Sequence, residues 1–241
     1  MDPLKTFKKE RKESIERFSR NGELWRVARR FMVAAIKGRY LYNFDWLGRP
    51  VIQFPQDIVA LQEIIWQTKP DLVIEAGIAH GGSLILHASI LGLLGGKGVV
   101  LGVDKDIRKH NRHAIEKHPL SRRIKMIEGS STDPKIFSLV KKFARNKRRV
   151  MVVLDSNHTH KHVLIELELY SQLISKGNYI VVFDTLIEYI PKENRPWGPG
   201  NSPATAVKEF LKSHKNFVVD KSIDAKLIIT AAPGGFLKRV R

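Results

Sequence analysis

Short β-branched runs alternate with helix-like patterns from residue 71 onward, and no other feature constrains the fold of this chain as strongly. Seven runs are expected to form strands, at residues 72–75, 99–104, 124–128, 150–155, 179–184, 217–220 and 227–230. Strands that alternate with helices form mainly parallel sheets covered on both faces. The sequence therefore predicts an α/β fold, with a Rossmann-like, seven-stranded, mainly parallel sheet flanked by helices.

Residues 1–45 are predicted to form a basic helical arm, ahead of a main domain that spans residues 46–241. Residues 1–40 contain twelve Lys or Arg against five Asp or Glu. Apolar residues recur there at three-and-four spacing, as on one face of a helix. They are Leu24, Val27, Ala28, Phe31, Met32 and Ala35. The main domain, a second subunit of a homo-oligomer or a membrane surface must cover this stripe.

The whole chain is strongly basic, with a net charge of +18 over 241 residues. Such a field concentrates anionic partners, namely nucleic acid, phosphates or acidic lipid, although an ordinary solvated surface can carry the same charge. The chain has no cysteine, which excludes disulfides and thiolate chemistry. No apolar run approaches the roughly 20 residues of a membrane-spanning helix. We expect a cytoplasmic protein without a transmembrane segment, and the arm leaves association with a membrane surface open.

An acid and three glycines connect the first strand of the predicted sheet to an apolar helix, between Glu75 and Ser83. Gly77 and Gly81 let the backbone come close to a ligand, and the helix start offers free N–H groups to an anion. Asp104 ends the second strand, where a carboxylate can accept hydrogen bonds from both ribose hydroxyls of a nucleotide. The G-x-G-x-x-G spacing of dinucleotide sites is absent, which disfavours NAD. The alternative is that both acids merely end their strands in water.

Small and hydroxyl-bearing residues follow the third strand, where they leave room for a planar ring. They are Gly129, Ser130 and Ser131. Their position in the strand order is where an adenine would lie in a nucleotide site. Read alone, the two serines and Asp133 can equally cap the next helix.

The sequence resembles the cephalosporin hydroxylase and rhamnosyl O-methyltransferase family from about Leu47 to Arg241. Its most specific motif is Leu-Asp-Ser-Asn-His-Thr-His-Lys-His-Val-Leu at residues 154–164. Further matches are Asp-Leu-Val-Ile-Glu at 71–75, Gly-Gly-Ser at 81–83, Glu-Gly-Ser-Ser at 128–131, Gly-Pro-Gly-Asn at 198–201 and Pro-Gly-Gly-Phe-Leu-Lys-Arg at 233–239. The resemblance implies the fold of a class I S-adenosylmethionine (SAM)-dependent methyltransferase.

The same resemblance implies a SAM site and a divalent metal beside it. The SAM site comprises Glu75, Gly77, Gly81, Ser83, Asp104, Gly129, Ser130, Ser131 and Asp155. The usual metal carriers are an aspartate after the fourth strand, here Asp155, and an adjacent acidic pair after the fifth. That pair reads Phe183-Asp184 in this chain, so one expected carboxylate is missing.

Methyl transfer to oxygen needs a hydroxyl that is held in line with the methyl group and relieved of its proton. Asp155 and Asp184 end neighbouring strands, so they can converge at the carboxyl edge of the sheet and hold Mg²⁺ together with waters. His158 is the predicted general base, because an imidazole can take up a proton near neutral pH. Alternatively, the two acids only end strands and meet the hydroxyl of Ser156 or Thr185.

Two further histidines, His160 and His162, are expected to serve the helix entry and its packing. The spacing of these histidines does not supply the two-histidine, one-carboxylate arrangement of an iron oxygenase. Hydroxylase activity is therefore not predicted from the family name. A loop at residues 187–203 follows the fifth strand and has the length of a lid over an acceptor. Trp197 in this loop can stack on a sugar ring or simply anchor the loop.

The leading hypothesis is therefore a SAM-dependent O-methyltransferase that acts on a hydroxyl of a saccharide or a small molecule, assisted by a divalent metal. One alternative is a noncatalytic SAM-binding module, since an acid is missing at Phe183. Another is a nucleic-acid-associated methyltransferase that uses the arm and the basic run at 141–149 to hold phosphates.

Overall fold

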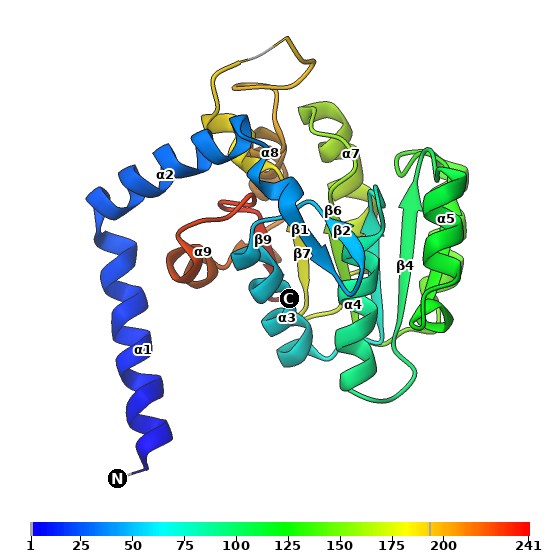
Figure 1. Ribbon diagram of the computed structural model, residues 1–241, viewed down its shortest axis with the longest axis horizontal. Coiled ribbons are helices and arrows are strands. Elements are labelled where there is room, and N and C mark those ends of the chain that lie inside the picture. Colours follow the sequence, from blue (N-terminus) through cyan, green and yellow to red (C-terminus); the bar gives the residue numbers. More distant parts are fainter. Residues whose placement is uncertain (1, 193) are drawn as a thin grey trace.

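The computed structural model describes residues 2–192 and 194–241, and they form one sheet with helices on both faces (Figure 1). The helices are α1 Pro3–Arg20, α2 Gly22–Lys37, α3 Pro55–Thr68, α4 Gly82–Leu93, α5 Lys109–Glu116, α6 Pro134–Ala144, α7 His160–Tyr170, α8 Pro203–Ser213 and α9 Lys221–Leu227. The strands are β1 Phe44–Trp46, β2 Arg49–Val51, β3 Leu72–Ala76, β4 Val99–Asp104, β5 Ile124–Glu128, β6 Val150–Leu154, β7 Tyr179–Val182, β8 Phe217–Val219 and β9 Phe236–Arg239. Short 3₁₀ turns lie at Tyr40–Asn43, Ser121–Arg123, Ser171–Leu173 and Thr185–Tyr189.

Seven strands form the main sheet in the order β5-β4-β3-β6-β7-β9-β8, and β1 pairs with β2 as a separate hairpin. The pairs from β5 to β7 are all parallel, whereas β9 runs antiparallel to both β7 and β8. The predicted seven-stranded, mainly parallel sheet is thus confirmed. The strand order changes direction between β3 and β6, and ligands of open α/β sheets bind beside such a point, at the carboxyl ends of the strands.

The seventh strand was predicted at the wrong place. The run at 227–230 contains the end of α9 and a turn, in which Ile228 has φ 63° and the Ile229 N–H donates to the carbonyl of Leu227 at 2.6 Å. Asp220 caps α9 through the N–H of Ser222, so the residues before the run form a helix. The seventh strand is β9 instead, where only two apolar residues precede Lys238 and Arg239.

Two apolar clusters cover the two faces of the sheet. One contains buried residues of α2, α3, α4, α5 and α9, and the other contains those of α6, α7 and α8. Alternate residues of β3 belong to opposite clusters, with Val73 in the first and Leu72 and Ile74 in the second. All five residues of β3 are buried, as expected of a central parallel strand.

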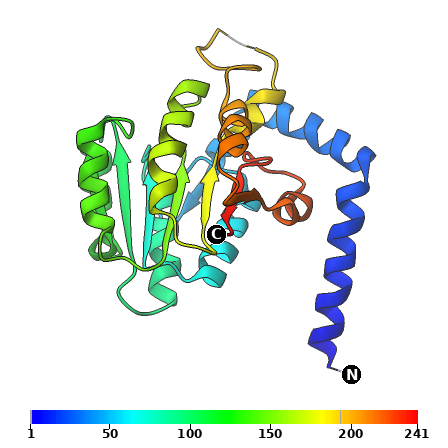
Figure 2. The ribbon, with the colours of Figure 1, turned by 180° about the vertical axis from the view of Figure 1, so that it is seen from behind.

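The predicted arm is helical, as α1 and α2, and part of its apolar stripe joins the core. Ala28, Met32 and Ala35 are buried in the first cluster, and the Met32 sulfur accepts a hydrogen bond from the N–H of Thr230 at 3.4 Å. Val27 and Phe31 remain 54% and 43% exposed. Helix α1 has no buried residue and lies at the edge of the molecule, where it contacts α9 (Figures 1 and 2). Among the described residues, no helix has both the length and the apolar character to cross a membrane.

Candidate active site

The turn after β3 is shaped by close approach of two backbones. Gly77 has φ 98°, and a Cβ there would lie 2.1 Å from the carbonyl oxygen of Asp155. Its N–H donates to the carbonyl of Val103 at 2.8 Å, so the ends of β3, β4 and β6 meet at this glycine. Gly81, with φ 83°, precedes the first residue of α4 and keeps the helix start open. Glycine is required at both positions because the conformation and the space exclude a side chain.

The acid at the end of β4 closes the same turn. Asp104 accepts hydrogen bonds through Oδ2 from the N–H groups of Ile78, at 2.7 Å, and Ala79, at 3.4 Å. Its other carboxylate oxygen accepts from the N–H of Asp106 at 3.1 Å. The carboxylate therefore holds the glycine-rich turn against the strand end, at the position where a ribose was expected.

A cavity of about 420 Å³ lies at the carboxyl ends of β3, β4, β6 and β7. We call its inner side the floor, which is lined by Gly77, Asp104, Asp155, His158 and Asp184. All five of these residues were predicted from the sequence as site residues. The cavity would accommodate a ligand that touches both the glycine-rich turn and the acids after β6 and β7.

The other predicted cofactor residues lie around the floor without lining the cavity. Glu75 is 1% exposed, and one of its carboxylate oxygens is 3.4 Å from Nε2 of the buried His87. Ser83 lies in the first turn of α4. Gly129 and Ser130 lie after β5, where the Ser130 hydroxyl bonds that of Thr132 at 2.9 Å.

Ser131 belongs to a buried polar network beside the cavity. Its hydroxyl donates to Glu166 at 2.5 Å, and the hydroxyl of Ser156 donates to the same carboxylate oxygen at 2.6 Å. Nε2 of His162 lies 3.2 Å from both hydroxyls. Glu166 is fully buried on α7, at a position of the apolar stripe that holds Val163 and Tyr170. A carboxylate within an apolar stripe is the sequence signal that would have revealed this network.

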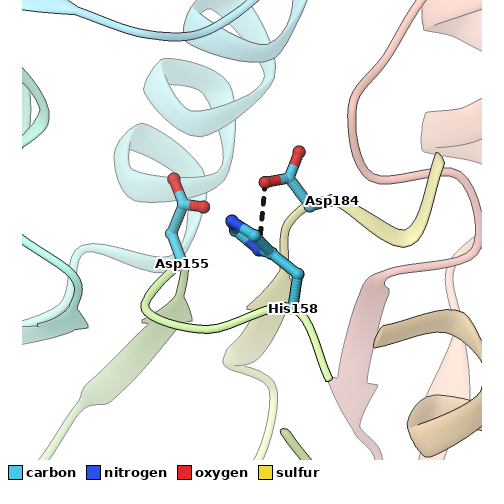
Figure 3. Close-up of side chains that lie close together, drawn as sticks. All are labelled: Asp155, His158 and Asp184. Carbon is cyan, nitrogen blue, oxygen red and sulfur yellow. Dashed lines mark ion pairs between the residues drawn. The ribbon is translucent and has the colours of Figure 1, made fainter. Parts of the chain in front are cut away.

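Three metal-ligating side chains converge at the floor (Figure 3). Asp155 follows β6, Asp184 follows β7, and His158 lies in the turn between β6 and α7. One ligand atom from each lies within 4.8 Å of the others, and Nδ1 of His158 is 3.2 Å from Oδ2 of Asp184. Burial, then the charges of Asp184 and Glu75, raise the pKa of Asp155 well above its usual value. Two carboxylates held this close favour a bound cation or a shared proton.

These donors fit a divalent cation, with two carboxylate oxygens and one imidazole nitrogen on rigid strand ends. The alternative in which the acids meet Ser156 and Thr185 is not what the structure shows. Ser156 donates to Glu166, and the Thr185 hydroxyl donates to the carbonyl of Pro233 at 2.8 Å. The two acids therefore face each other and His158 across the cavity.

Comparison with known proteins identifies the family. The family model described as Rhamnosyl O-methyltransferase/CmcI matches residues 38–240. A rhamnosyl O-methyltransferase of Mycobacterium bovis (strain BCG / Pasteur 1173P2) is 34% identical over 188 residues, covering 76% of this chain and 73% of its own. That of Mycobacterium leprae (strain TN) is 30% identical over 208 residues, covering 84% and 86%. The chain belongs to the rhamnosyl O-methyltransferase/CmcI family.

Solved structures confirm the fold of this family member. A CmcI structure with SAH superposes with a TM-score of 0.61 at 18% identity, covering 83% of this chain and 84% of the other. An O-methyltransferase from Bacillus cereus in complex with SAH gives a TM-score of 0.51 at 16% identity, covering 80% and 81%. The fold is that of the class I methyltransferases, as predicted.

The acid missing from the pair after β7 has an apolar replacement in this family member. Phe183 is 2% exposed and packs in the first cluster with Leu186 and Ile190. Phe183 also lines the cavity, so an apolar residue stands where the family pattern has a carboxylate. His158 supplies a third donor next to the two remaining acids, which the sequence analysis had assigned only as a base.

A second buried acid supports the turn that carries Asp184. Asp57, at the start of α3, accepts hydrogen bonds from the Thr230 hydroxyl at 2.5 Å and the Ala231 N–H at 2.8 Å. The carbonyl of Ala231 in turn accepts from the N–H of Leu186 at 3.2 Å. Burial raises the pKa of Asp57 to about 7. Sequence reasoning missed Asp57, although it precedes the apolar stripe of α3 by one turn.

The loop at 187–203, here called the lid, is held by its own polar contacts. Glu188 accepts hydrogen bonds from the Gly200 N–H at 3.0 Å and the Ser202 hydroxyl at 2.6 Å. Trp197 lies edge-on to the ring of His158, with ring centroids 5.0 Å apart and an interplanar angle of 83°. Trp197 thus contacts His158 inside the site, and its stacking on a sugar ring stays a prediction.

Proposed function

We propose that this family member is a SAM-dependent O-methyltransferase, which moves a methyl group to a hydroxyl of a saccharide or small-molecule acceptor with the help of a divalent metal. The observation that carries the proposal is the convergence of Asp155, His158 and Asp184 on the floor of the cavity, beside the glycine-rich turn. The mycobacterial relatives are rhamnosyl O-methyltransferases, which supports a sugar hydroxyl as acceptor.

SAM is expected to bind along the turn after β3. The absence of a side chain at Gly77 lets the turn pack against the backbone of Asp155, and the carboxylate of Asp104, which lines the cavity, is expected to accept hydrogen bonds from the ribose hydroxyls. Glu75 is buried in β3 just before the turn, and Gly81 and Ser83 form the start of α4 just after it, so these three residues are proposed to shape the SAM site. The turn containing Gly129, Ser130 and Ser131 is proposed to border the adenine, with Ser131 fixed by the buried Glu166.

His158 is proposed as the base that receives the hydroxyl proton. Its Nδ1 faces Asp184 at 3.2 Å, so a proton on Nδ1 leaves Nε2 free to accept another. The acceptor oxygen loses its proton to Nε2 as it attacks the methyl carbon, and the bond between that carbon and the sulfonium sulfur breaks. The products are a methyl ether and SAH, while Asp184 stabilises the resulting imidazolium.

A divalent cation bound by Asp155 and Asp184 would lower the pKa of a coordinated acceptor hydroxyl and hold it in line with the methyl group. Asp155 and Asp184 are set for this by their strand ends, and the edge-on contact with Trp197 helps to hold the His158 ring beside them. The missing acid at Phe183 leaves fewer protein oxygens for the cation than the family pattern provides. We therefore expect this chain to bind Mg²⁺ more weakly than family members that have the full acidic pair.

Calorimetric titration with SAM, with and without Mg²⁺, tests this function. We expect Asp104→Ala to abolish SAM binding and Asp155→Ala to remove only the effect of the metal. Failure of the wild-type protein to bind SAM would contradict the proposal. SAM binding without SAH formation over a panel of glycosides and phenols would instead support a noncatalytic SAM-binding module.

The basic arm is further proposed to contact an anionic surface. Leu4 and Phe7 on α1 and Val27 and Phe31 on α2 are exposed, next to the basic residues of both helices. These features support a membrane surface rich in acidic lipid, and the same faces suit a subunit contact. Two measurements distinguish these cases. Salt-sensitive sedimentation with acidic vesicles would support a membrane surface, and a molar mass in solution above that of one chain would support a subunit contact.

A further inference from the structure

Three cationic residues line the cavity from segments other than the strand ends that carry the acids of the floor. They are Arg39, from the end of the arm, and Lys192 and Arg195, from the lid, and we call the part of the cavity that they line the mouth. All three residues are exposed to solvent. They come from segments about 150 residues apart, which the fold alone brings to one cavity.

Arg39 is held in an unusual conformation at the mouth. Its φ is 55°, in the left-handed region that residues with a side chain rarely adopt. Its guanidinium lies over the ring of Tyr42, 4.5 Å from the ring centroid, and Tyr42 also lines the cavity. This left-handed residue ends α2 just after its C-cap Gly38 and turns the chain towards the short 3₁₀ turn that contains Tyr42.

Neither Arg39 nor Lys192 is neutralised by a carboxylate within residues 2–192 and 194–241. The acids of the cavity lie on the floor instead, where Asp155 and Asp184 face His158. The cavity is therefore negative at the reacting end and positive at the mouth. A ligand with a hydroxyl at one end and an anionic group at the other matches both ends.

We propose that the acceptor carries an anionic group, a phosphate or a carboxylate, which Arg39 and Lys192 bind at the mouth while the hydroxyl lies at the floor. The proposal rests on the proposed methyl transfer and narrows its substrate class to anionic hydroxyl compounds. A planar guanidinium binds two oxygens of a phosphate or carboxylate at once, and a lysine ammonium adds a point charge. Tyr42 and Trp197, at the two sides of the mouth, supply aromatic surface for a sugar ring.

The test uses the full chain loaded with SAH and Mg²⁺ and titrated in a calorimeter with three probes. The probes are glucose 1-phosphate, glucuronic acid and the neutral methyl glucoside, which separate phosphate, carboxylate and uncharged ring. Variants are Arg39→Gln, Lys192→Gln and the pair together, with Arg39→Lys to retain the charge. Lys176→Gln is the matched control, because Lys176 is an exposed lysine before β7, at the opposite edge of the sheet.

We expect at least one anionic probe to bind the wild-type protein at least tenfold more tightly than methyl glucoside. The double variant should lose this difference, Arg39→Lys should keep part of it, and Lys176→Gln should keep all of it. Which anion binds more tightly tells a phosphate acceptor from a carboxylate acceptor.

Three results would overturn the inference. They are absence of binding by both anionic probes, equal binding of the neutral glucoside, and unchanged anion binding in the double variant. If the double variant instead loses affinity for SAH, the cations hold the carboxylate of the cofactor and the acceptor assignment is wrong. Failure of SAH to bind the wild-type protein is a different outcome, which contradicts the proposed methyl transfer itself.

Discussion

A single glycine connects three strand ends at the cofactor turn. Gly77 donates to the carbonyl of Val103 and lies against the carbonyl of Asp155, so it joins the ends of β4 and β6 to that of β3. A methyl group at this position would overlap the backbone that carries Asp155. The geometry of the cofactor turn and that of the metal-ligating acids are thus set by the same residue.

We expect Gly77→Ala to destabilise the protein and abolish SAM binding. The added Cβ forces backbone apart and occupies a φ of 98°, which together cost about 2–4 kcal/mol. Gly95→Ala is the control, because Gly95 has a similar φ of 75° but open space around it. Thermal unfolding and SAM titration of both variants measure the effect, and equal behaviour of the two would rule out the backbone clash as its cause.

His158 is expected to serve the chemical step rather than cofactor binding. His158→Ala should lower the rate of methyl transfer by about 10²–10⁴-fold, because it removes the base near the acceptor oxygen. The affinity for SAM should stay within about twofold of wild type, since His158 contacts Asp184 and Trp197 instead of the glycine-rich turn. Single-turnover kinetics and calorimetry test the two parts, and an unchanged rate would remove His158 from the mechanism.

Among the secondary-structure elements, α3 and the turn after β7 are coupled through a buried acid. Asp57 on α3 binds Thr230 and Ala231, and Ala231 binds the turn that starts at Thr185. The geometry of Asp184 therefore depends on a carboxylate at the start of a helix on the covering face. Since Asp57 is fully buried, its protonation state also affects the stability of the fold.

The folded-state pKa of Asp57, about 7, exceeds its ordinary value of 3.8, so the folded protein binds this proton more tightly than the unfolded chain. Its contribution to the free energy of unfolding is greatest below pH 4 and is lost as the pH rises towards 7. Relative to wild type, Asp57→Asn should therefore gain a few kcal/mol between pH 4 and pH 7. Denaturant unfolding at several pH values measures the difference, and a pH-independent difference would contradict the buried titration.

Most strands could be located from the sequence because they contain runs of apolar, often β-branched residues. β3, β4 and β6 are flanked by strands on both sides and covered by helices, so most of their residues are apolar and buried. β9 was missed because half of its four residues are Lys238 and Arg239, while the apolar residues at 227–230 lie in a turn. The local amino-acid composition does not show which later segment of the chain pairs with β7, because that pairing depends on the tertiary structure.

The same reasoning explains what was predicted of the site. Acids at the carboxyl ends of parallel strands meet by topology, so Asp104, Asp155 and Asp184 could be placed together from the sequence. Asp57 on α3 and Glu166 on α7 could not, because their side chains enter the site region from helices far apart in the chain. Arg39 was likewise assigned to the arm, and only the packing of α2 brings it to the cavity.

At the scale of the whole molecule, the arm divides into a peripheral helix and a helix that is part of the core. Helix α1 has no buried residue, whereas α2 places Ala28, Met32 and Ala35 in the first cluster. The end of α2 also contributes Ile36 to the wall of the cavity. Part of the predicted arm therefore packs in the core, and a domain boundary near residue 45 stays a prediction.

Deletion experiments should reveal this division. Removing residues 2–20 is expected to change the free energy of unfolding by about 1 kcal/mol or less, since no buried side chain is lost. Removing residues 2–37 takes three buried side chains from the core and should cost several kcal/mol. Denaturant unfolding of the two shortened proteins measures this, and equal stability would mean that α2 is as dispensable as α1.

The position of β9 between β7 and β8 has a consequence for folding during synthesis of the protein. Residues 236–239 are synthesised after the other strands of this sheet, and until then β8 has no partner in the sheet and β7, which precedes Asp184, has an open edge. We therefore expect the turn after β7 to reach its final geometry only once β9 has paired. A chain that stops short of β9 is expected to hold Asp184 less firmly at the floor of the cavity.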